Sequence, residues 1–278
     1  MFADYHVHTA FSDDSIYPME QVVQDATSKK IDEICFTEHV DYGIKVDWDS
    51  GKEIVYRNGE PCANCNYPLY MKTIKQMKER YGNKITIKTG LEFGMQMHTI
   101  KLYEKLFSQY DLDFVLLSIH QVNDLEIWNQ DYQRGKTQKE YNEGYYDEML
   151  QLVKSYKNYS VLAHMDLITR YDNDGVYSFE KIKNKITEIL KIVIGDGKGI
   201  ELNTSSRRYG LSDSTPCRDI LTLYYNLGGN IITIGSDSHK PEHLGAYIQE
   251  GKELLRSIGF TQYCTFEKMK QYFILFRI

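Results

Sequence analysis

The chain alternates seven times between a short segment of mostly apolar, often β-branched residues and a longer amphipathic segment. The short segments predict strands at residues 2–8, 31–37, 85–93, 113–120, 159–164, 199–203 and 230–235. The amphipathic segments predict helices at residues 19–29, 70–81, 100–110, 139–156, 178–194, 214–227 and 243–258. This alternation is typical of α/β proteins with a parallel sheet, and its length favours a sheet closed into a TIM-like barrel. An open doubly wound sheet is the alternative, and residues 263–278 stay unassigned.

The composition is that of an ordinary globular protein. Hydrophobic residues make up 42% of the chain and charged residues 26%, which excludes wholesale disorder. The 33 basic and 39 acidic residues give a net charge of −6 without a basic block, so we expect no nucleic-acid partner. We also expect no membrane span, because no long apolar run occurs. The N-terminus does not resemble a signal peptide, so we expect one cytoplasmic domain over residues 1–278.

Residues 41–67 form an irregular stretch that is too long for an ordinary connection, which indicates a functional loop. This loop holds Cys62 and Cys65, the one CxxC motif of the chain. A structural zinc site of this type needs a second pair of ligands, and the sequence has no second CxxC. We therefore expect two reduced thiols, with a redox pair as the alternative.

Six of the eight histidines lie at or just after the carboxyl ends of predicted strands, and Glu92 and Asp237 share this placement. These histidines are His6, His8, His39, His120, His164 and His239. In a parallel barrel the carboxyl ends of the strands converge on one face, where active sites are built. Residues two apart on a strand point the same way, so the pairs His6/His8 and Asp237/His239 can each bind one ion. One such pair is a weak signal, but their coincidence predicts a metal site.

The number of ligand residues indicates more than one ion. Six imidazoles, Glu92, Asp237 and an aspartate at position 13 or 14 exceed the four to six donors of a mononuclear site. The sequence therefore predicts two or three divalent ions, zinc, manganese or iron, with a bridging carboxylate. Clustered divalent ions bind a phosphoryl group and activate water at neutral pH, so the predicted activity is metal-dependent phosphoester hydrolysis.

Eight short motifs carry a family resemblance. They are residues 4–9 (DYHVHT), 11–15 (FSDDS), 37–39 (TEH), 90–92 (GLE), 118–120 (SIH), 163–164 (AH), 201–205 (ELNTS) and 235–239 (GSDSH). In this order they resemble the motifs of the PHP (polymerase and histidinol phosphatase) family, and most closely those of its histidinol-phosphate phosphatases. The resemblance covers nearly the whole chain. It implies a distorted seven-stranded β/α barrel with a trinuclear metal centre.

The resemblance also assigns the metal ligands by position. It implies a first ion held by His6, His8, Glu92 and Asp237, a second by Glu92, His120 and His164, and a third by Asp14, His39 and His239. Many members of the family have a histidine where this chain has Asp14, and Asp13 remains a rival for that position. An aspartate there makes iron or manganese more plausible beside zinc.

The phosphate-binding residues follow from residues 203–208 (NTSSRR), which resemble the family's NTSGLR motif. The resemblance implies that Arg208 binds phosphate and that Ser205 adds a hydrogen bond. Arg170, after the fifth predicted strand, is a second candidate, whereas Arg207 is expected in a solvated turn.

The reaction that the family resemblance implies is hydrolysis of a small phosphate monoester, in particular L-histidinol phosphate to L-histidinol and phosphate. Asp237, Glu92 and His239 are the expected catalytic groups. A different monoester, a phosphodiester, or a non-catalytic metal-binding module are the alternatives. The substrate's alcohol portion and the oligomeric state are not readable from these motifs.

Overall fold

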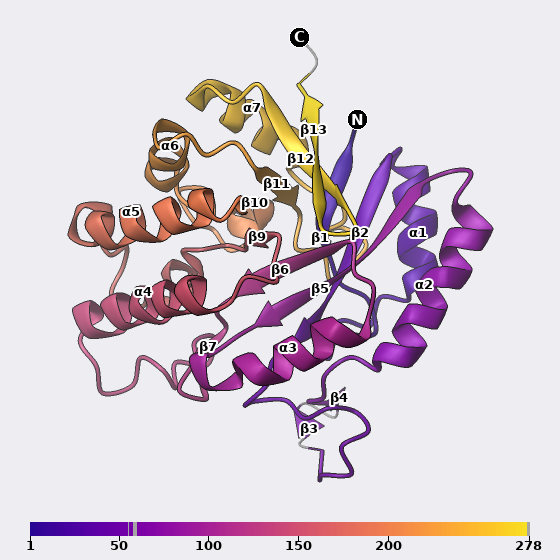
Figure 1. The fold of residues 1–278 in the computed structure, drawn as a ribbon, viewed down its shortest axis with the longest axis horizontal. Coiled ribbons are helices and arrows are strands. Elements are labelled where there is room, and N and C mark those ends of the chain that lie inside the picture. Colours follow the sequence, from indigo (N-terminus) through magenta and orange to yellow (C-terminus); the bar gives the residue numbers. More distant parts are fainter. Residues whose placement is uncertain (55, 58–59, 277–278) are drawn as a thin grey trace.

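Seven parallel strands form one sheet, in the order β1–β2–β5–β6–β9–β10–β11 (Figure 1). The computed structural model describes residues 1–54, 56–57 and 60–276. The strands are β1 (Ala3–Val7), β2 (Glu33–Val40), β5 (Thr86–Gly94), β6 (Phe114–Ser118), β9 (Val161–Leu162), β10 (Gly199–Asn203) and β11 (Ile232–Gly235). The two end strands meet through a parallel bridge between Val7 and Ser238. The amide of His8 donates to Ser238 O over 2.8 Å, and the Ser238 amide donates to His6 O over 3.1 Å. The sheet thus closes into a distorted barrel, as predicted, and is not an open sheet.

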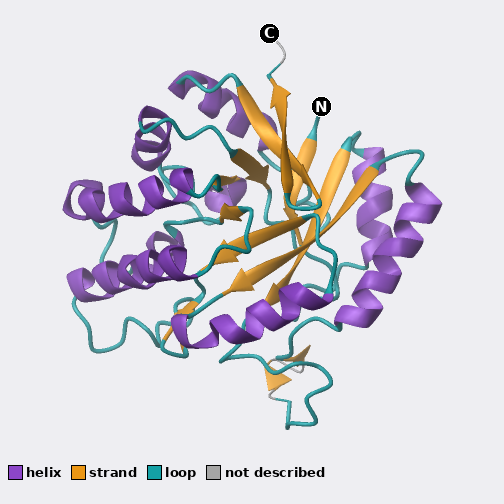
Figure 2. Cartoon of the chain, viewed as in Figure 1, coloured by secondary structure: helices purple, strands orange, loops and turns teal. Residues whose placement is uncertain are grey.

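Seven α-helices of the described chain lie outside this sheet (Figure 2). They are α1 (Met19–Ser28), α2 (Tyr67–Tyr81), α3 (Ile100–Gln109), α4 (Gln138–Ser155), α5 (Phe179–Gly195), α6 (Arg218–Asn226) and α7 (Ile248–Ile258). Helix α5 shows why they form here: Ile182, Ile186, Ile189 and Val193 recur at helical spacing and are all buried. The helices therefore bury their apolar faces against strands that are themselves buried.

Two helices begin later than the sequence predicts. Helix α6 starts after Pro216 rather than at residue 214, because a residue that precedes proline is disfavoured in the helical region. Helix α7 starts at Ile248 rather than at residue 243. Gly245 and Tyr247 have φ values of +71° and +61°, which a right-handed helix does not contain.

Three short hairpins complete the described fold. They are β3 (Tyr56–Arg57) with β4 (Glu60–Pro61), β7 (Gln121–Val122) with β8 (Leu125–Glu126), and β12 (Gln262–Glu267) with β13 (Lys270–Leu275). The first lies in the long loop after β2, of which residues 55 and 58–59 fall outside the described residues. The last is formed by the segment that the sequence left unassigned. The 3₁₀ turns are η1 (Met97–Thr99), η2 (Leu167–Tyr171) and η3 (Thr204–Arg207).

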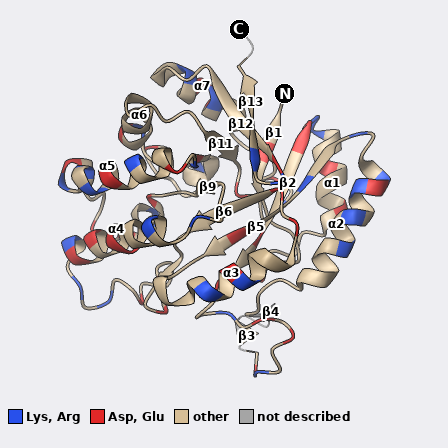
Figure 3. Cartoon of the chain, viewed as in Figure 1, with Lys and Arg blue, Asp and Glu red and all other residues tan. Residues whose placement is uncertain are grey.

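The charged residues are mixed in sign along the outer helices. Figure 3 shows basic and acidic positions interspersed on α2, α4 and α5. Among the described residues, no helix is both long enough and apolar enough to cross a membrane.

Candidate metal centre

Glu92, near the end of β5, lies in the middle of the imidazole cluster. Its Oε2 atom lies 3.1 Å from His6 Nε2 and 3.4 Å from His8 Nε2. Its Oε1 atom lies 2.8 Å from His164 Nε2 and 3.1 Å from His120 Nε2. His6 and His8 lie at the end of β1, His120 lies two residues after β6, and His164 lies two residues after β9. The barrel thus brings together residues from three strand ends around Glu92.

The aspartate at position 14 reaches the outer part of the cluster. Asp14 Oδ2 lies 3.1 Å from His239 Nε2 and 3.4 Å from His39 Nε2. The neighbouring Asp13 instead pairs with Lys45, whose Nζ lies 2.6 Å from Asp13 Oδ1. Of the two rival aspartates, the structure places Asp14 beside the imidazoles.

Asp237 completes the set from the chain after β11. Its Oδ1 atom lies 3.8 Å from the Nε2 atoms of both His6 and His8. Its φ of +56° lies in the left-handed region, which few residues other than glycine adopt. Arg208 supports this backbone, because its guanidinium donates to Ser236 O over 2.7 Å and to Asp237 O over 2.8 Å.

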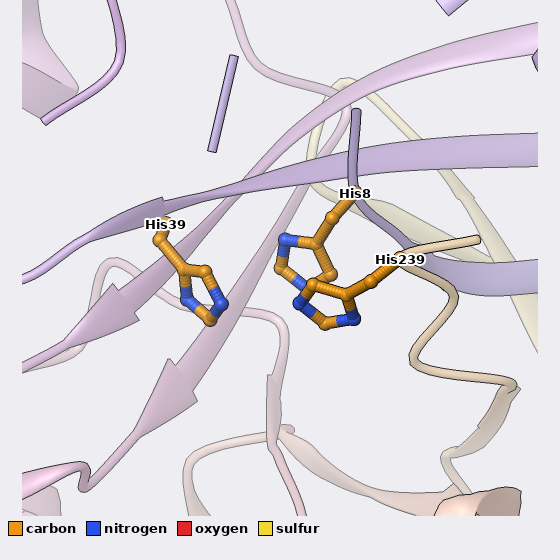
Figure 4. A group of neighbouring side chains, drawn as sticks. All are labelled: His8, His39 and His239. Carbon is orange, nitrogen blue, oxygen red and sulfur yellow. The ribbon is translucent and has the colours of Figure 1, made fainter. Parts of the chain in front are cut away.

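The donor atoms group into four overlapping sets of three, each with atoms within 4.8 Å of one another. The sets are His6/His8/Asp237, His6/Glu92/His164, His8/His39/His239 and His39/Asp41/His120. Figure 4 shows the imidazoles of the third set gathered together, and the ring centroid of His8 lies 4.2 Å from that of His39 and from that of His239. The overlap means that several ions can share ligands, as expected for a multinuclear site.

A test of fit is whether these donors are satisfied without an ion. The Nε2 atoms of His8 and His239 are buried and form no hydrogen bond with any described residue, although a carboxylate oxygen lies within 3.4 Å of each. A buried polar atom without a partner is unfavourable, and an imidazole lone pair is a common metal ligand. The donor set therefore fits divalent metal ions.

Two carboxylates orient histidines by contacting the ring nitrogen that faces away from Glu92. Glu201 Oε1 lies 2.6 Å from His6 Nδ1, and Asp41 Oδ1 lies 2.7 Å from His120 Nδ1. In both histidines the other ring nitrogen, Nε2, faces Glu92. A carboxylate on one nitrogen fixes the tautomer and turns the free lone pair of the other nitrogen toward a metal.

A third support is a hydrogen-bond chain behind His8. The Ser12 hydroxyl donates to Glu38 Oε2 over 2.7 Å, and His8 Nδ1 lies 3.1 Å from the same hydroxyl oxygen. Because the hydroxyl proton is directed to Glu38, the ring N–H of His8 must donate to Ser12. This leaves His8 Nε2 as a lone-pair donor. Burial raises the pKa of Glu38 to about 7, against its hydrogen bonds from Ser12 and Thr9.

The sequence predicted no supporting role for these residues, although Ser12 and Glu201 lie within motifs 11–15 and 201–205. Glu201 had a detectable signal, because it stands two positions before Asn203 on the same strand and so faces the same way. Asp41 and Ser12 had none, since both lie in loops whose path the sequence does not reveal.

The two central carboxylates are held ionised. Burial alone would raise the pKa of Glu92, but the imidazoles of His6, His120 and His39 hold it well below its usual range. Burial would also raise the pKa of Asp237, and His6 leads the neighbouring positive groups that hold it low. Glu92 and Asp237 are therefore ionised and can act as carboxylate ligands at neutral pH.

A cavity of about 340 Å³ opens over this cluster. Its described wall includes Arg170, whose Nη2 lies 3.7 Å from Asp237 Oδ2 and donates to Ser205 Oγ over 2.5 Å. Arg208 and Ser205 are not part of this wall. The structure thus brings the second candidate, Arg170, to the cavity and places Arg208 and Ser205 behind it.

Two further sequence features lie outside the cluster. His98 falls in η1, just before α3, and its Nε2 lies 3.0 Å from Asp124 Oδ1. Cys62 and Cys65 are buried free thiols in the long loop.

A closed parallel barrel with imidazoles and carboxylates gathered at the carboxyl ends of its strands defines a metal-dependent hydrolase scaffold. Within that class the chain belongs to the PHP domain family, whose model matches residues 4–205. The resemblance found in the motifs is thereby confirmed.

Alignments with named relatives cover almost the entire chain. A histidinol-phosphatase of Lactococcus lactis is 29% identical over 274 residues, covering 96% of this chain and 95% of the relative. A probable histidinol-phosphatase of Clostridium acetobutylicum is 31% identical over 250 residues, covering 88% of this chain and 89% of the relative.

Solved structures agree with these relatives. The crystal structure of histidinol phosphate phosphatase from Lactococcus lactis, complexed with zinc, L-histidinol and phosphate, superposes with a TM-score of 0.85 at 29% identity and covers 98% of both chains. A putative histidinol phosphatase from Listeria monocytogenes matches with a TM-score of 0.72 at 20% identity, covering 89% of this chain and 99% of the other, and shows the shared fold.

Proposed function

We propose that this protein hydrolyses L-histidinol phosphate to L-histidinol and inorganic phosphate in a metal-dependent reaction. The observation that carries the proposal is the cavity that joins the imidazole–carboxylate cluster to the guanidinium of Arg170. Metal ligands beside a fixed cation suit a phosphate monoester, whose oxygens carry the charge to be neutralised. The likeness to the Lactococcus lactis structure with L-histidinol and phosphate supports this substrate.

The metal ligands that we propose are those that the family resemblance implied. They are His6, His8, Asp14, His39, Glu92, His120, His164, Asp237 and His239. Their number supports two or three ions, and their mixture of imidazole and carboxylate suits zinc, manganese or iron. Bound divalent ions would neutralise the phosphoryl oxygens and lower the pKa of an attacking water.

The chain's own groups have distinct roles in this proposal. Glu92 holds the cluster together from its centre, and Asp237, kept ionised beside Arg170, would orient the attacking water by accepting a hydrogen bond from it. His239 lines the same cavity, but its Nε2 is a proposed metal ligand and its Nδ1 lies 3.0 Å from Asp237 O, so the leaving alcohol would take its proton from a water molecule in the cavity.

Arg170 is the phosphate-binding arginine that the geometry supports best. Its side chain is nearly buried, its guanidinium carbon lies 3.9 Å from the ring centroid of Tyr209, and Ser205 accepts one of its hydrogen bonds. A guanidinium fixed in this way is ready to bind phosphate oxygens with little loss of side-chain entropy. Arg208, which the family motif implies, would then act through the backbone of Asp237, because its guanidinium holds that carbonyl.

The test is a phosphate-release assay on protein stripped of metal and reloaded separately with Zn²⁺, Mn²⁺ or Fe²⁺. L-Histidinol phosphate is compared with a panel of sugar phosphates and dinucleotides, and bound metal per chain is measured in parallel. We expect release that requires metal and a kcat/KM for L-histidinol phosphate at least about 100-fold above the panel, the discrimination that polar recognition in a binding site can supply. A preference for another monoester or for a dinucleotide would mean that L-histidinol phosphate is not the substrate. Metal binding without any release would favour the non-catalytic module.

A further inference from the structure

The long loop after β2 begins with a tight turn over residues 41–45, to which the proposed function assigns no role. The Lys45 amide donates to Asp41 O over 2.8 Å, which closes the turn. Gly43 lies inside the turn with a φ of +100°, a conformation that residues with a Cβ atom rarely adopt. The turn therefore folds the side chain of Lys45 back toward that of Asp41, four residues earlier.

The far part of the same loop holds this turn in place. The Asp41 amide donates to Asn64 Oδ1 over 2.9 Å, and the Asn64 amide donates to Val46 O over 2.8 Å. The Asn64 side chain also donates to Asp47 Oδ1 over 3.2 Å. Asn64 is 2% exposed, so these bonds are shielded from water and keep the turn in one conformation.

The ammonium group of Lys45 lies between two carboxylates. Its Nζ donates to Asp13 Oδ1 over 2.6 Å and lies 2.8 Å from Asp41 Oδ2. The side chains of all three residues are at most 10% exposed. Burial would lower the pKa of Lys45, but Asp41 and Asp13 hold it above its usual range, so the ammonium group stays charged. An ion pair shielded from water in this way is stronger than one at the surface.

Asp41 is the residue through which Lys45 reaches the metal centre. Asp41 Oδ1 lies 2.7 Å from His120 Nδ1, while Asp41 Oδ2 is held by Lys45. Because each carboxylate oxygen has its own partner, Asp41 is fixed in one orientation. The His120 ring is fixed in turn, since its Nδ1–H donates to that carboxylate.

The barrel leaves space for this contact at Gly94, the last residue of β5. A Cβ atom at that position would lie 1.8 Å from Asp41 Oδ1 and 2.7 Å from His120 Nδ1. Any larger residue would therefore push apart the two atoms of the hydrogen bond. The close contact between Asp41 and His120 thus depends on a glycine in the neighbouring strand.

We infer that Lys45 is a positioning residue of the metal centre, which acts by fixing Asp41 and, through it, the ring of His120. Asp13 fixes the ammonium group from the other side. This inference rests on the proposed function, because His120 is one of the metal ligands proposed there. It also gives the long loop a role, which is to fix a metal ligand that the barrel supplies.

The charge of Lys45 makes the inference testable by the sign of one effect. A positive charge near a bound cation weakens binding, so loss of the charge alone should strengthen metal binding. Loss of a residue that orients a ligand should instead weaken it, by about 10- to 100-fold. We expect the loss of orientation to dominate, because Asp41 contacts the ligand directly whereas the charge of Lys45 lies one residue further away.

The experiment measures metal affinity by competition with a chelator, using Zn²⁺ or Mn²⁺, whichever the wild-type protein binds more tightly. We expect Lys45→Met, which keeps the side-chain length and removes the charge, to lower the affinity about 10- to 100-fold. Asp41→Asn should lower it to a similar extent. Adding Lys45→Met to Asp41→Asn should then lower it less than about threefold further, because both residues act through one contact.

Two further variants serve as controls. Lys75→Met, an exposed lysine on α2, is the matched control and should leave the metal affinity unchanged. Circular dichroism checks that each variant is folded. If Lys45→Met is unfolded, Lys45→Gln takes its place with the same expected loss, because it also removes the charge.

Each outcome has a separate meaning. Unchanged or stronger metal binding by Lys45→Met, or full additivity with Asp41→Asn, would overturn the positioning role and leave the proposed reaction standing. A wild-type protein that binds metal but releases no phosphate would refute the proposed function, and the metal affinities of the variants would still decide the role of Lys45. A wild-type protein that binds neither ion would overturn both.

Discussion

Both ends of the barrel contain buried polar side chains, but the two ends differ in whether the chain supplies hydrogen-bond partners for them. At the amino ends of the strands, the Tyr5 hydroxyl donates to buried Glu33 and accepts the amide of Phe266 over 2.7 Å. At the carboxyl ends, His8 and His239 each keep a buried Nε2 without a hydrogen bond to any described residue. The chain itself satisfies the polar groups at the amino end, whereas it leaves donor atoms at the carboxyl end that fit the metal ions we propose.

The C-terminal hairpin β12–β13 supplies the hydrogen-bond partners at the amino end of the barrel. Between β12 and β13, the turn caps the amino end of β6, where Asp113 O accepts the Met269 amide over 3.0 Å and Asp113 Oδ1 accepts the Lys268 amide over 3.1 Å. The ring of Phe266 lies 5.0 Å from that of Phe114, between centroids. Residues at this end should therefore act on stability, and residues at the cluster should act on activity.

The largest expected effect is at the cluster. Asp237→Asn removes a central carboxylate while keeping its shape, so kcat/KM for L-histidinol phosphate should fall by about 10³-fold or more, at the upper end for a single charge-stabilising group. Circular dichroism should show a folded protein, because the amide fits the same space. Asp111→Asn, an exposed aspartate, is the control. Activity close to that of the wild type would refute the role of Asp237.

The second effect is at the opposite end. Phe266→Ala leaves a void between Tyr5 and Phe114, and the free energy of unfolding should fall by about 3–5 kcal/mol. Activity of the folded fraction should stay within about twofold, because distant sites act independently. Urea denaturation and initial rates measure the two quantities.

Phe273 provides the matched control for this substitution. It is 44% exposed on β13, so Phe273→Ala should change stability by about 0.5 kcal/mol or less. A large loss of activity in Phe266→Ala would mean that the two ends are coupled, against the division described above.

The third effect concerns the supporting carboxylates. Glu201→Gln weakens the support of His6, so metal affinity should fall about 10- to 100-fold while activity recovers at saturating metal. Competition with a chelator measures the affinity, and Glu253→Gln on the exposed face of α7 is the control. Unchanged affinity would show that Glu201 is a purely structural residue.

The predictable part of this molecule is the part with a repeating pattern. Strand–helix periodicity indicated all seven barrel strands, and the period of two within a strand placed His6 beside His8. The closure of a parallel barrel then made residues far apart in the chain, such as His39 and His239, neighbours.

The parts that escaped prediction depend on loop geometry and backbone turns. Arg208 and Arg170 both follow strand ends, and nothing in their local sequence shows that one holds a carbonyl of Asp237 while the other lines the cavity. The hairpin β12–β13 gave no strand signal that could be placed, because β13 is mostly exposed and β12 buries one short run of residues. Its position is fixed by contacts with Tyr5 and Phe114, which only the tertiary structure supplies.

The smallest expected effect is at the amino end of the barrel. It tests whether hydrogen bonds within the chain satisfy the buried polar groups there. Burial raises the pKa of Glu33, although the hydrogen bond from Tyr5 and the charge of Lys88 oppose the shift. The folded protein therefore binds this proton more tightly than the unfolded chain, whose glutamate pKa is about 4.3. The stability that Glu33 contributes is complete below that pH and is lost as the pH rises through the folded pKa.

Glu33→Gln should remove this dependence because the amide does not titrate. The difference in unfolding free energy between the variant and the wild type should therefore shift in favour of the variant as the pH rises above about 4.3, without a change in kcat/KM. Urea denaturation at several pH values measures the slope, and Glu253→Gln, an exposed glutamate on α7, is the control. A slope that is the same in variant and wild type would mean that burial does not raise the pKa of Glu33, and that the amino end of the barrel is not shielded from water.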